Sequence, residues 1–247
     1  AYFNREELLG RELDTLNLKW GWRVFWNAFT GEAESFWGWW RHEIKAALVR
    51  LRLPAFLVAL VLIAGSLIGV QQAQVFQLPP DVINLQNLEQ GFMEGIEGLD
   101  AVRFFAVQGV RWIWLHNLQV VLLATFLGLF SFGVMGLLIL MLPFVILGYL
   151  TATAARAGIP ILTFLTAFVL PHGILEIPAI LLSGAAIFRL GATLSRPAEG
   201  RTIGEALLIS LADWVKIVLA VVVPLFLGAA ILEVFLTPAV AIKIFGG

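Results

Sequence analysis

The feature that most constrains the fold of this chain is a run without charged side chains from Leu118 to Ala155, about 38 residues long. A transmembrane helix needs only about 20 apolar residues, at a rise of about 1.5 Å per residue. The run is therefore too long for one crossing, and we expect two spans joined near Gly133–Gly136 or at Pro143. Because its apolar residues are continuous rather than alternating, the spans should be helices and not strands of a barrel.

The composition of the whole chain agrees with this class. Hydrophobic residues make up 60% of the chain and charged residues only 13%, against about 45–50% and 25% in soluble domains. The absence of cysteine excludes disulfides, thiolate nucleophiles and iron–sulfur clusters. The net charge of −1 gives no indication of a nucleic-acid partner. We predict an all-α, polytopic transmembrane bundle whose first partner is the lipid bilayer.

Residues 1–53 are predicted to lie at the membrane surface, and residues 54–247 to form the transmembrane domain. No cleavable signal peptide is expected, because residues 1–6 lack an apolar core. Six of the nine tryptophans lie in the first segment, and tryptophan prefers the headgroup level. Two apolar stripes follow helical spacing: Leu9, Leu13, Leu16 and Trp20, then Phe36, Trp40, Ile44, Ala47 and Leu51. We expect an amphipathic interfacial helix bent at Pro54 into the first span. It would serve as an anchoring elbow or, alternatively, as a docking surface for a cytosolic partner.

The first predicted span runs from Pro54 to about Val70 and extends at most to Phe76. Gly65 and Gly69 lie four residues apart in it, a small-xxx-small pattern that lets another helix approach closely. Residues 78–115 are predicted to form an external amphipathic segment, because apolar residues recur there at helical spacing opposite acidic ones.

After Ala155 the apolar stretches are shorter. Residues 161–170 are too short to cross and fit a half-helix or re-entrant segment, which a break at Pro171–Gly173 separates from a span over 174–194. The last span should lie within 206–236, with a kink near Pro224 and an interfacial tail over 238–247. The prediction is thus about five spans plus a half-helix. Gly184 and Gly191 should form a close-packing face.

The distribution of basic residues predicts the orientation. The segment before Pro54 carries eight: Arg5, Arg11, Lys19, Arg23, Arg41, Lys45, Arg50 and Arg52. Residues 71–117 carry only Arg103 and Arg111. The positive-inside rule therefore places the N-terminus of a multi-pass inner-membrane protein in the cytoplasm. Two other polar features are expected to be local: an Asp213–Lys216 pair one turn apart, and Glu233 reaching the outer surface.

His172 and Glu176 are the most informative polar residues within the spans. An ionisable group at membrane depth costs about 2.5–3.5 kcal/mol on insertion scales. On a helix beginning near Pro171, the two side chains share one face. Gly173 leaves room for another chain or a water molecule, and Asn117 enters the second span.

Three interpretations of this pair remain open. The two side chains could hydrogen-bond to neighbouring helices and fix the bundle. They could line a wet cavity for a proton, an ion or a polar headgroup. They could also coordinate a cation with His116 or Asn117, but no HExxH-type spacing supports this.

We predict no metal site, no catalytic residue and no cofactor. The lysines Lys19, Lys45, Lys216 and Lys243 are not followed by Ser or Thr, so there is no phosphate-binding P-loop. No serine lies in a G-x-S-x-G elbow.

The run Pro171-His172-Gly173 with Glu176, followed by Gly184-Ala185-Ala186 and Leu190-Gly191, resembles the signature of the stage II sporulation protein M family of membrane proteins. Asn117 and the series Gly128, Gly133, Gly136 and Gly148 support the resemblance, which covers roughly residues 50–235. It implies an inner-membrane component of a larger assembly, with no catalytic residue to carry over. The founding member works with cell-wall hydrolases during engulfment of the forespore, and some relatives resemble membrane subunits partnered with ABC-type ATPases.

Two functions follow as hypotheses. The first is a non-enzymatic inner-membrane subunit that forms homo- or hetero-oligomers and serves a multiprotein envelope complex, with a cell-wall hydrolase as one candidate partner. The second is a permease subunit that moves a lipid, ion or small solute, driven by an ABC-type ATPase or a proton gradient.

Overall fold

In the computed structural model of the chain, residues 18–77, 99–195 and 200–245 are described, and every regular element among them is a helix. The predicted stripe at Leu9, Leu13 and Leu16, and most of the amphipathic stripe predicted within 78–115, lie outside these residues. The all-α class is confirmed.

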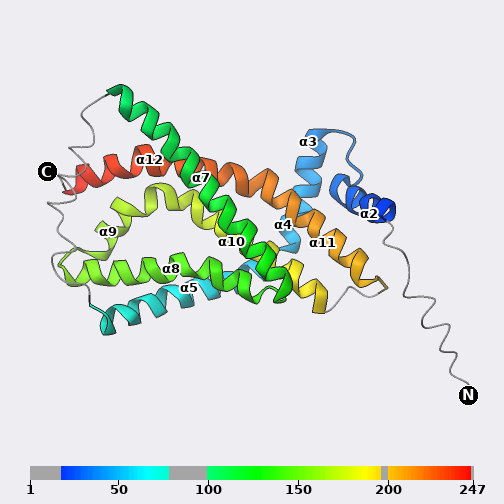
Figure 1. Ribbon diagram of the computed structural model, residues 1–247, viewed down its shortest axis with the longest axis horizontal. Helices are drawn as coiled ribbons and strands as arrows, with labels where there is room; N and C mark the ends of the chain where they lie inside the picture. Colours follow the sequence, from blue (N-terminus) through cyan, green and yellow to red (C-terminus); the bar gives the residue numbers. More distant parts are fainter. Residues whose placement is uncertain (1–17, 78–98, 196–199, 246–247) are drawn as a thin grey trace, which may run out of the picture.

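Five helical stretches are long and apolar enough to cross a membrane. They are α5 (Arg52–Val75), α7 (Leu99–Phe130, apolar from Ala106), α8 (Val134–Arg156), α10 (Leu170–Ser195) and the joined stretch Ile203–Phe245. Four of them run roughly along the long axis of the molecule and α7 crosses obliquely, while α5 lies beside α8 along much of its length (Figure 1). The predicted number of spans is confirmed.

The long uncharged run is divided between α7 and α8. The turn between them contains Phe132 and Gly133, both with positive φ (53° and 96°), a conformation that glycine adopts without strain. The join therefore falls at the first of the two predicted places, and Pro143 lies inside α8. The helix of the second span begins well before Leu118, because α7 is continuous from Leu99.

The last span is interrupted by one π-helical turn. α11 (Ile203–Ile217) passes through η3 (Val218–Val222) into α12 (Val223–Phe245). Pro224 has no N–H, and its ring would clash with the carbonyl four residues earlier in a regular helix, so the wider turn lies where this clash must be relieved. α12 continues through Pro238 to Phe245, so the described part of the expected interfacial tail is helical.

The N-terminal segment forms what we call the elbow, residues 18–51. It consists of α2 (Leu18–Thr30), α3 (Phe36–Trp39), the π-helical turn η1 (Trp40–Ile44) and α4 (Lys45–Arg50). The chain turns at Leu51, and the predicted bend residue Pro54 lies in the first turn of α5. Part of the second predicted apolar face is buried, at Ile44, Ala47 and Leu51, whereas Phe36 and Trp40 remain exposed.

Stacked aromatic rings hold the elbow together. The rings of Trp22, Trp26, Phe29 and Trp39 follow one another with centroid separations of 5.3–5.8 Å. The indole N–H of Trp39 also donates to the carbonyl of Phe29 at 2.6 Å. The elbow lies against α11, where Gly21 faces Leu208.

α10 is the central helix of the bundle. Half of its most apolar window is buried, against a third or less in the other spans. It packs against α5, α7, α8, α11 and α12. Gly184 faces Val58 of α5, and Gly191 faces the α7–α8 turn at Gly133. The burial is concentrated from Ala179 to Gly191; near the start of α10 the side chains of His172 and Glu176 are partly buried, whereas Leu170 and Ile174 are exposed.

Candidate functional site

The predicted motif lies in the first two turns of α10. The half-helix α9 spans Ile161–Phe168, and the helix is broken at Val169 (φ −123°, ψ −53°). The break was expected two residues later, at Pro171–Gly173. Because α10 already begins at Leu170, Pro171 lies in its first turn, where proline is tolerated. Because His172 and Glu176 lie four residues apart on this helix, their side chains share one face, as predicted.

A third ionisable residue joins this pair from another helix. The Nε2 atom of His172 lies 3.6 Å from Oε2 of Glu176. Glu233 of α12 completes the group, so that one potential ligand atom of each residue lies within 4.8 Å of the others. Glu233 was expected at the outer surface, and the structure instead places it here. We call His172, Glu176 and Glu233 the central cluster.

Thr237 holds the other side of the imidazole ring. Its Oγ1 lies 3.0 Å from Nδ1 of His172, one turn beyond Glu233 on α12. The same hydroxyl donates to the carbonyl of Leu232 at 3.3 Å. The ring is thereby fixed with Nε2 toward the carboxylates.

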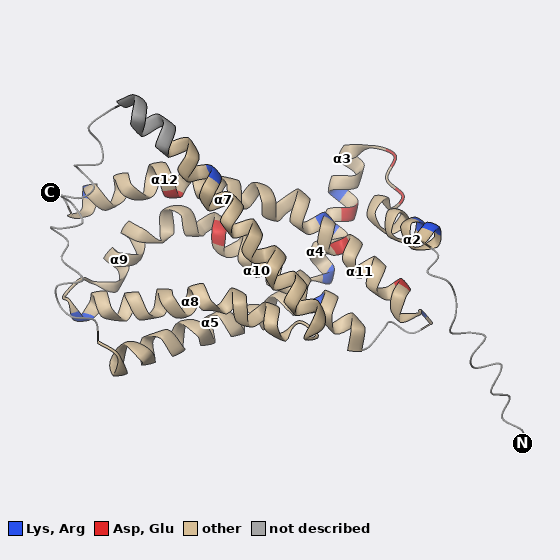
Figure 2. Cartoon of the chain, viewed as in Figure 1, with Lys and Arg blue, Asp and Glu red and all other residues tan. Residues whose placement is uncertain are grey.

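The central cluster lines a cavity of about 460 Å³. Pro143, Phe144 and Leu147 of its wall lie near the middle of α8, which places the cavity deep in the span. His116 and Asn117 of α7 also line it, so the structure brings Asn117 to the same cavity as His172, Glu176 and Gly173. None of the lining residues is Lys or Arg. Figure 2 shows acidic positions on α10 and α12 within otherwise uncharged helix.

A second group of charged side chains lies at the elbow end of the bundle, where charged residues gather in Figure 2. Asp213 accepts two hydrogen bonds from Arg50, at 2.7 and 2.9 Å, and one from Arg189 at 2.6 Å. Lys216 donates to Glu43 at 2.7 Å and lies 3.7 Å from Asp213. We call Glu43, Arg50, Arg189, Asp213 and Lys216 the charge network. It joins the elbow to α10 and α11, so the expected local pair of Asp213 and Lys216 is one contact within a larger group.

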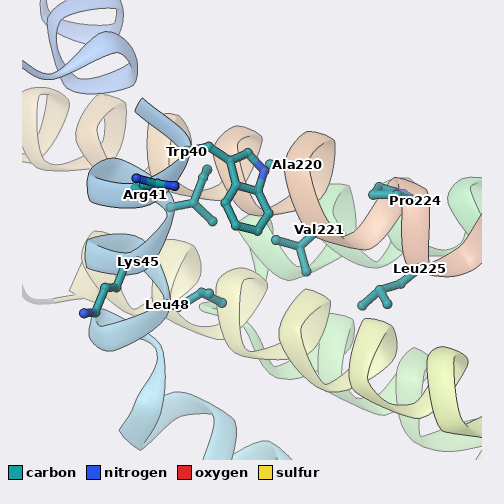
Figure 3. Close-up of a pocket in the computed structure, with 9 residues that line it drawn as sticks. Trp40, Arg41, Lys45, Leu48, Ala220, Val221, Pro224 and Leu225 are labelled. Atoms are coloured by element: carbon teal, nitrogen blue, oxygen red, sulfur yellow. The ribbon is translucent and has the colours of Figure 1, made fainter. Parts of the chain in front are cut away.

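A groove of about 580 Å³ opens between the elbow and the last span. Figure 3 shows the Trp40 ring over Val221, with Arg41 and Lys45 at the elbow side. The other lining residues are apolar: Ile44, Leu48, Ala220, Pro224 and Leu225. Unlike the cavity, the groove has no acidic side chain and no converging polar atoms.

The sequence itself contains a signal for the inward position of Glu233. Glu233 is the only charged residue between Lys216 and Lys243, just as Glu176 is the only one between Arg156 and Arg189. Two isolated acids in separate spans are each costly in lipid, so both should face the protein interior. No local sequence pattern, however, shows that these two spans lie side by side.

Comparison with known protein families supports the resemblance seen in the sequence. No curated protein and no solved structure matches the chain. The family described as stage II sporulation protein M, however, matches residues 55–238, which include all five spans in whole or in part. The match covers most of the 247 residues and includes the central cluster, Thr237 and Asn117. The chain therefore belongs to the stage II sporulation protein M family of membrane proteins.

Proposed function

We propose that this chain is a non-enzymatic inner-membrane subunit of a multiprotein envelope complex, with its N-terminus in the cytoplasm. The observation that carries the proposal is the fixed attachment of the elbow. An interfacial helix that only anchored the chain would need no buried ion pairs, yet the elbow contributes Glu43 and Arg50 to the charge network. A fixed, aromatic-rich surface at one end of the bundle suits docking of a partner.

The groove beside the elbow is the proposed docking site. Its walls are apolar apart from Arg41 and Lys45, and neither basic residue has an ion-pair partner among the residues that the structure describes. We infer that the occupant is an apolar transmembrane segment of a partner subunit, with an Asp or Glu at its cytoplasmic end. The acidic residue would pair with the two basic ones and give the contact its register.

Cross-linking from a single cysteine tests this docking site, because the natural chain has no cysteine. Val221→Cys in the groove, labelled with a photoreactive maleimide in native membranes, is expected to form one discrete adduct with another membrane protein. Leu142→Cys, on the exposed face of α8 (57% exposed), is the matched control and should label lipid only. Adding Arg41→Glu and Lys45→Glu should reduce the Val221 adduct at least several-fold, since like charges then face each other. Equal labelling from both cysteines, or no effect of charge reversal, would contradict the proposal.

The cavity favours a second candidate, a permease subunit for an ion or a small solute. Ionisable side chains inside spans mark ion pathways in many transporters. In proteoliposomes with pH- and cation-sensitive dyes, wild-type protein should then show flux that Glu176→Gln abolishes. Glu205→Gln, in the exposed pair with Arg201, should leave the flux unchanged. A gene for an ABC-type ATPase beside the gene for this chain would support the transport function. A neighbouring gene for a cell-wall hydrolase would support the envelope-complex function. Flux that persists in Glu176→Gln would exclude the cavity as the route.

A further inference from the structure

The hydrogen bonds of Thr237 favour one tautomer of His172. A threonine hydroxyl has one proton to donate, and that of Thr237 goes to the carbonyl of Leu232. With its proton on that carbonyl, the hydroxyl accepts from Nδ1–H across the 3.0 Å contact, and this is the tautomer that we assign to the ring. In the neutral ring the lone pair then lies on Nε2, the atom that faces Glu176.

Three electron-pair donors consequently converge in the cavity: Nε2 of His172 and one carboxylate oxygen each from Glu176 and Glu233. No Lys or Arg lines the cavity to compensate two carboxylates. Groups of like charge held together at low dielectric repel one another strongly. Buried charges in proteins are paired or coordinate metals, and the only basic side chains among the lining residues are the imidazoles of His116 and His172.

We propose that the central cluster binds one divalent transition-metal ion, such as Zn²⁺. Two carboxylates balance its charge, so the filled site is neutral, as a site at membrane depth favours. An imidazole ligand favours such ions over Mg²⁺ and Ca²⁺, which prefer oxygen donors. Metal–ligand bonds of about 2.0–2.2 Å bring neighbouring donor atoms to roughly 3–3.5 Å. The 3.6 Å separation of His172 and Glu176 is close to this range, and the three donor atoms, all within 4.8 Å of one another, would draw together around the ion.

The surroundings of the cluster have the features of a metal site with an open position. Thr237 would act as the outer partner that orients a metal-binding histidine through its second nitrogen. Three protein ligands leave at least one coordination position facing the cavity, on whose wall Asn117 lies. The ion could therefore enter, exchange or be released. The proposal rests on these side chains alone and needs neither the partner nor the flux proposed above.

The test uses the full-length protein purified in nanodiscs, stripped with a chelator and then titrated with Zn²⁺ or Co²⁺. We expect one ion per chain by equilibrium dialysis and a Co²⁺ absorption band in the visible range. Glu233→Gln and His172→Gln should each abolish the band and the stoichiometric ion. Matched controls are Glu205→Gln at a half-exposed position and His42→Gln at an exposed one, which remove the same groups outside the cavity. Both controls should bind as the wild type does.

Thr237→Val gives a graded readout that does not remove a ligand. It should weaken binding by about 10- to 100-fold, the usual effect of losing such an outer partner. If a variant does not fold, the wild-type stoichiometry and Co²⁺ spectrum still decide. Substoichiometric binding by the wild type, or equal loss in the two controls, would overturn the proposal and indicate protons or adventitious surface binding instead. Because the isolated chain is measured, failure here leaves the cross-linking result unaffected, and the reverse also holds.

Discussion

Asp213→Asn is expected to destabilise the folded protein by about 3–5 kcal/mol, the usual effect of removing one partner from a buried ion pair. The Asp213 side chain is only 6% exposed and receives three charge-assisted hydrogen bonds from Arg50 and Arg189. Lys216, 1% exposed, lies 3.7 Å away. Without the carboxylate, three cations share the single anion Glu43. The elbow, α10 and α11 would therefore repel one another where they now meet.

The measurement is the free energy of unfolding in detergent micelles, followed by tryptophan fluorescence. Glu205→Gln is the matched control, since its contact with Arg201 is 3.9 Å long and both side chains are at least 36% exposed. Exposed pairs of this kind contribute about 0–1 kcal/mol. A second variant, Lys216→Met with Glu43→Gln, removes both partners of one pair and should be tolerated far better than Asp213→Asn. If Asp213→Asn behaves like the control, the charge network does not hold the elbow in place.

The spans could be predicted from the sequence because lipid leaves the backbone few alternatives. Every N–H and C=O in the hydrocarbon must be bonded internally, so a long apolar run such as 118–155 must be helical and must turn once. The half-helix at 161–168 followed for the same reason, since eight residues cannot cross. The helix breaks at Val169 rather than at Pro171. Just before this break, Phe168 of α9 stacks on Phe245 of α12 with ring centroids 5.6 Å apart. No local sequence pattern indicates such a contact between distant residues.

The partners of charged residues could be predicted only where they are close in the chain. Helical spacing indicated Asp213 with Lys216, and that contact exists at 3.7 Å. Arg50, which makes two hydrogen bonds to Asp213, is 163 residues away in the sequence. The same limit explains Glu233, which we predicted at the outer surface: periodicity within α12 cannot show that α10 supplies His172 and Glu176 as its neighbours.

The small residues of the first span indicated that another helix approaches closely, but not which helix. The pattern Gly65-xxx-Gly69 could have served a contact between two copies of the chain. In the structure it packs within the chain, against α8, where a Cβ on Gly65 would lie 2.5 Å from Met141 and one on Gly69 would lie 1.9 Å from the carbonyl oxygen of Val145. A glycine on the facing helix completes the contact, since a Cβ on Gly148 would lie 2.0 Å from the carbonyl oxygen of Ser66.

Gly148→Ala is therefore expected to destabilise the protein by about 3 kcal/mol or more, at or above the upper end of ordinary overpacking. The added methyl group would meet the backbone of α5, which cannot rotate away as a side chain could. Relief requires α5 and α8 to separate along the interface that also positions the cavity-lining middle of α8. Gly69→Ala should have an effect of similar size, because its methyl group would meet the backbone of α8. The two changes together should add less than their sum, since one separation of the helices relieves both.

Gly204→Ala measures the effect of helix propensity alone, without any effect of packing. A Cβ at Gly204, in the first turn of α11, has no heavy atom within 4 Å. Alanine there should be neutral or should stabilise the helix by up to about 1 kcal/mol. The same stability measurement on all three variants decides the matter, because helix propensity favours alanine in each. If Gly148→Ala raises the unfolding free energy as Gly204→Ala does, then α5 and α8 do not approach as closely as the backbone geometry requires, and the glycines serve a contact outside the chain.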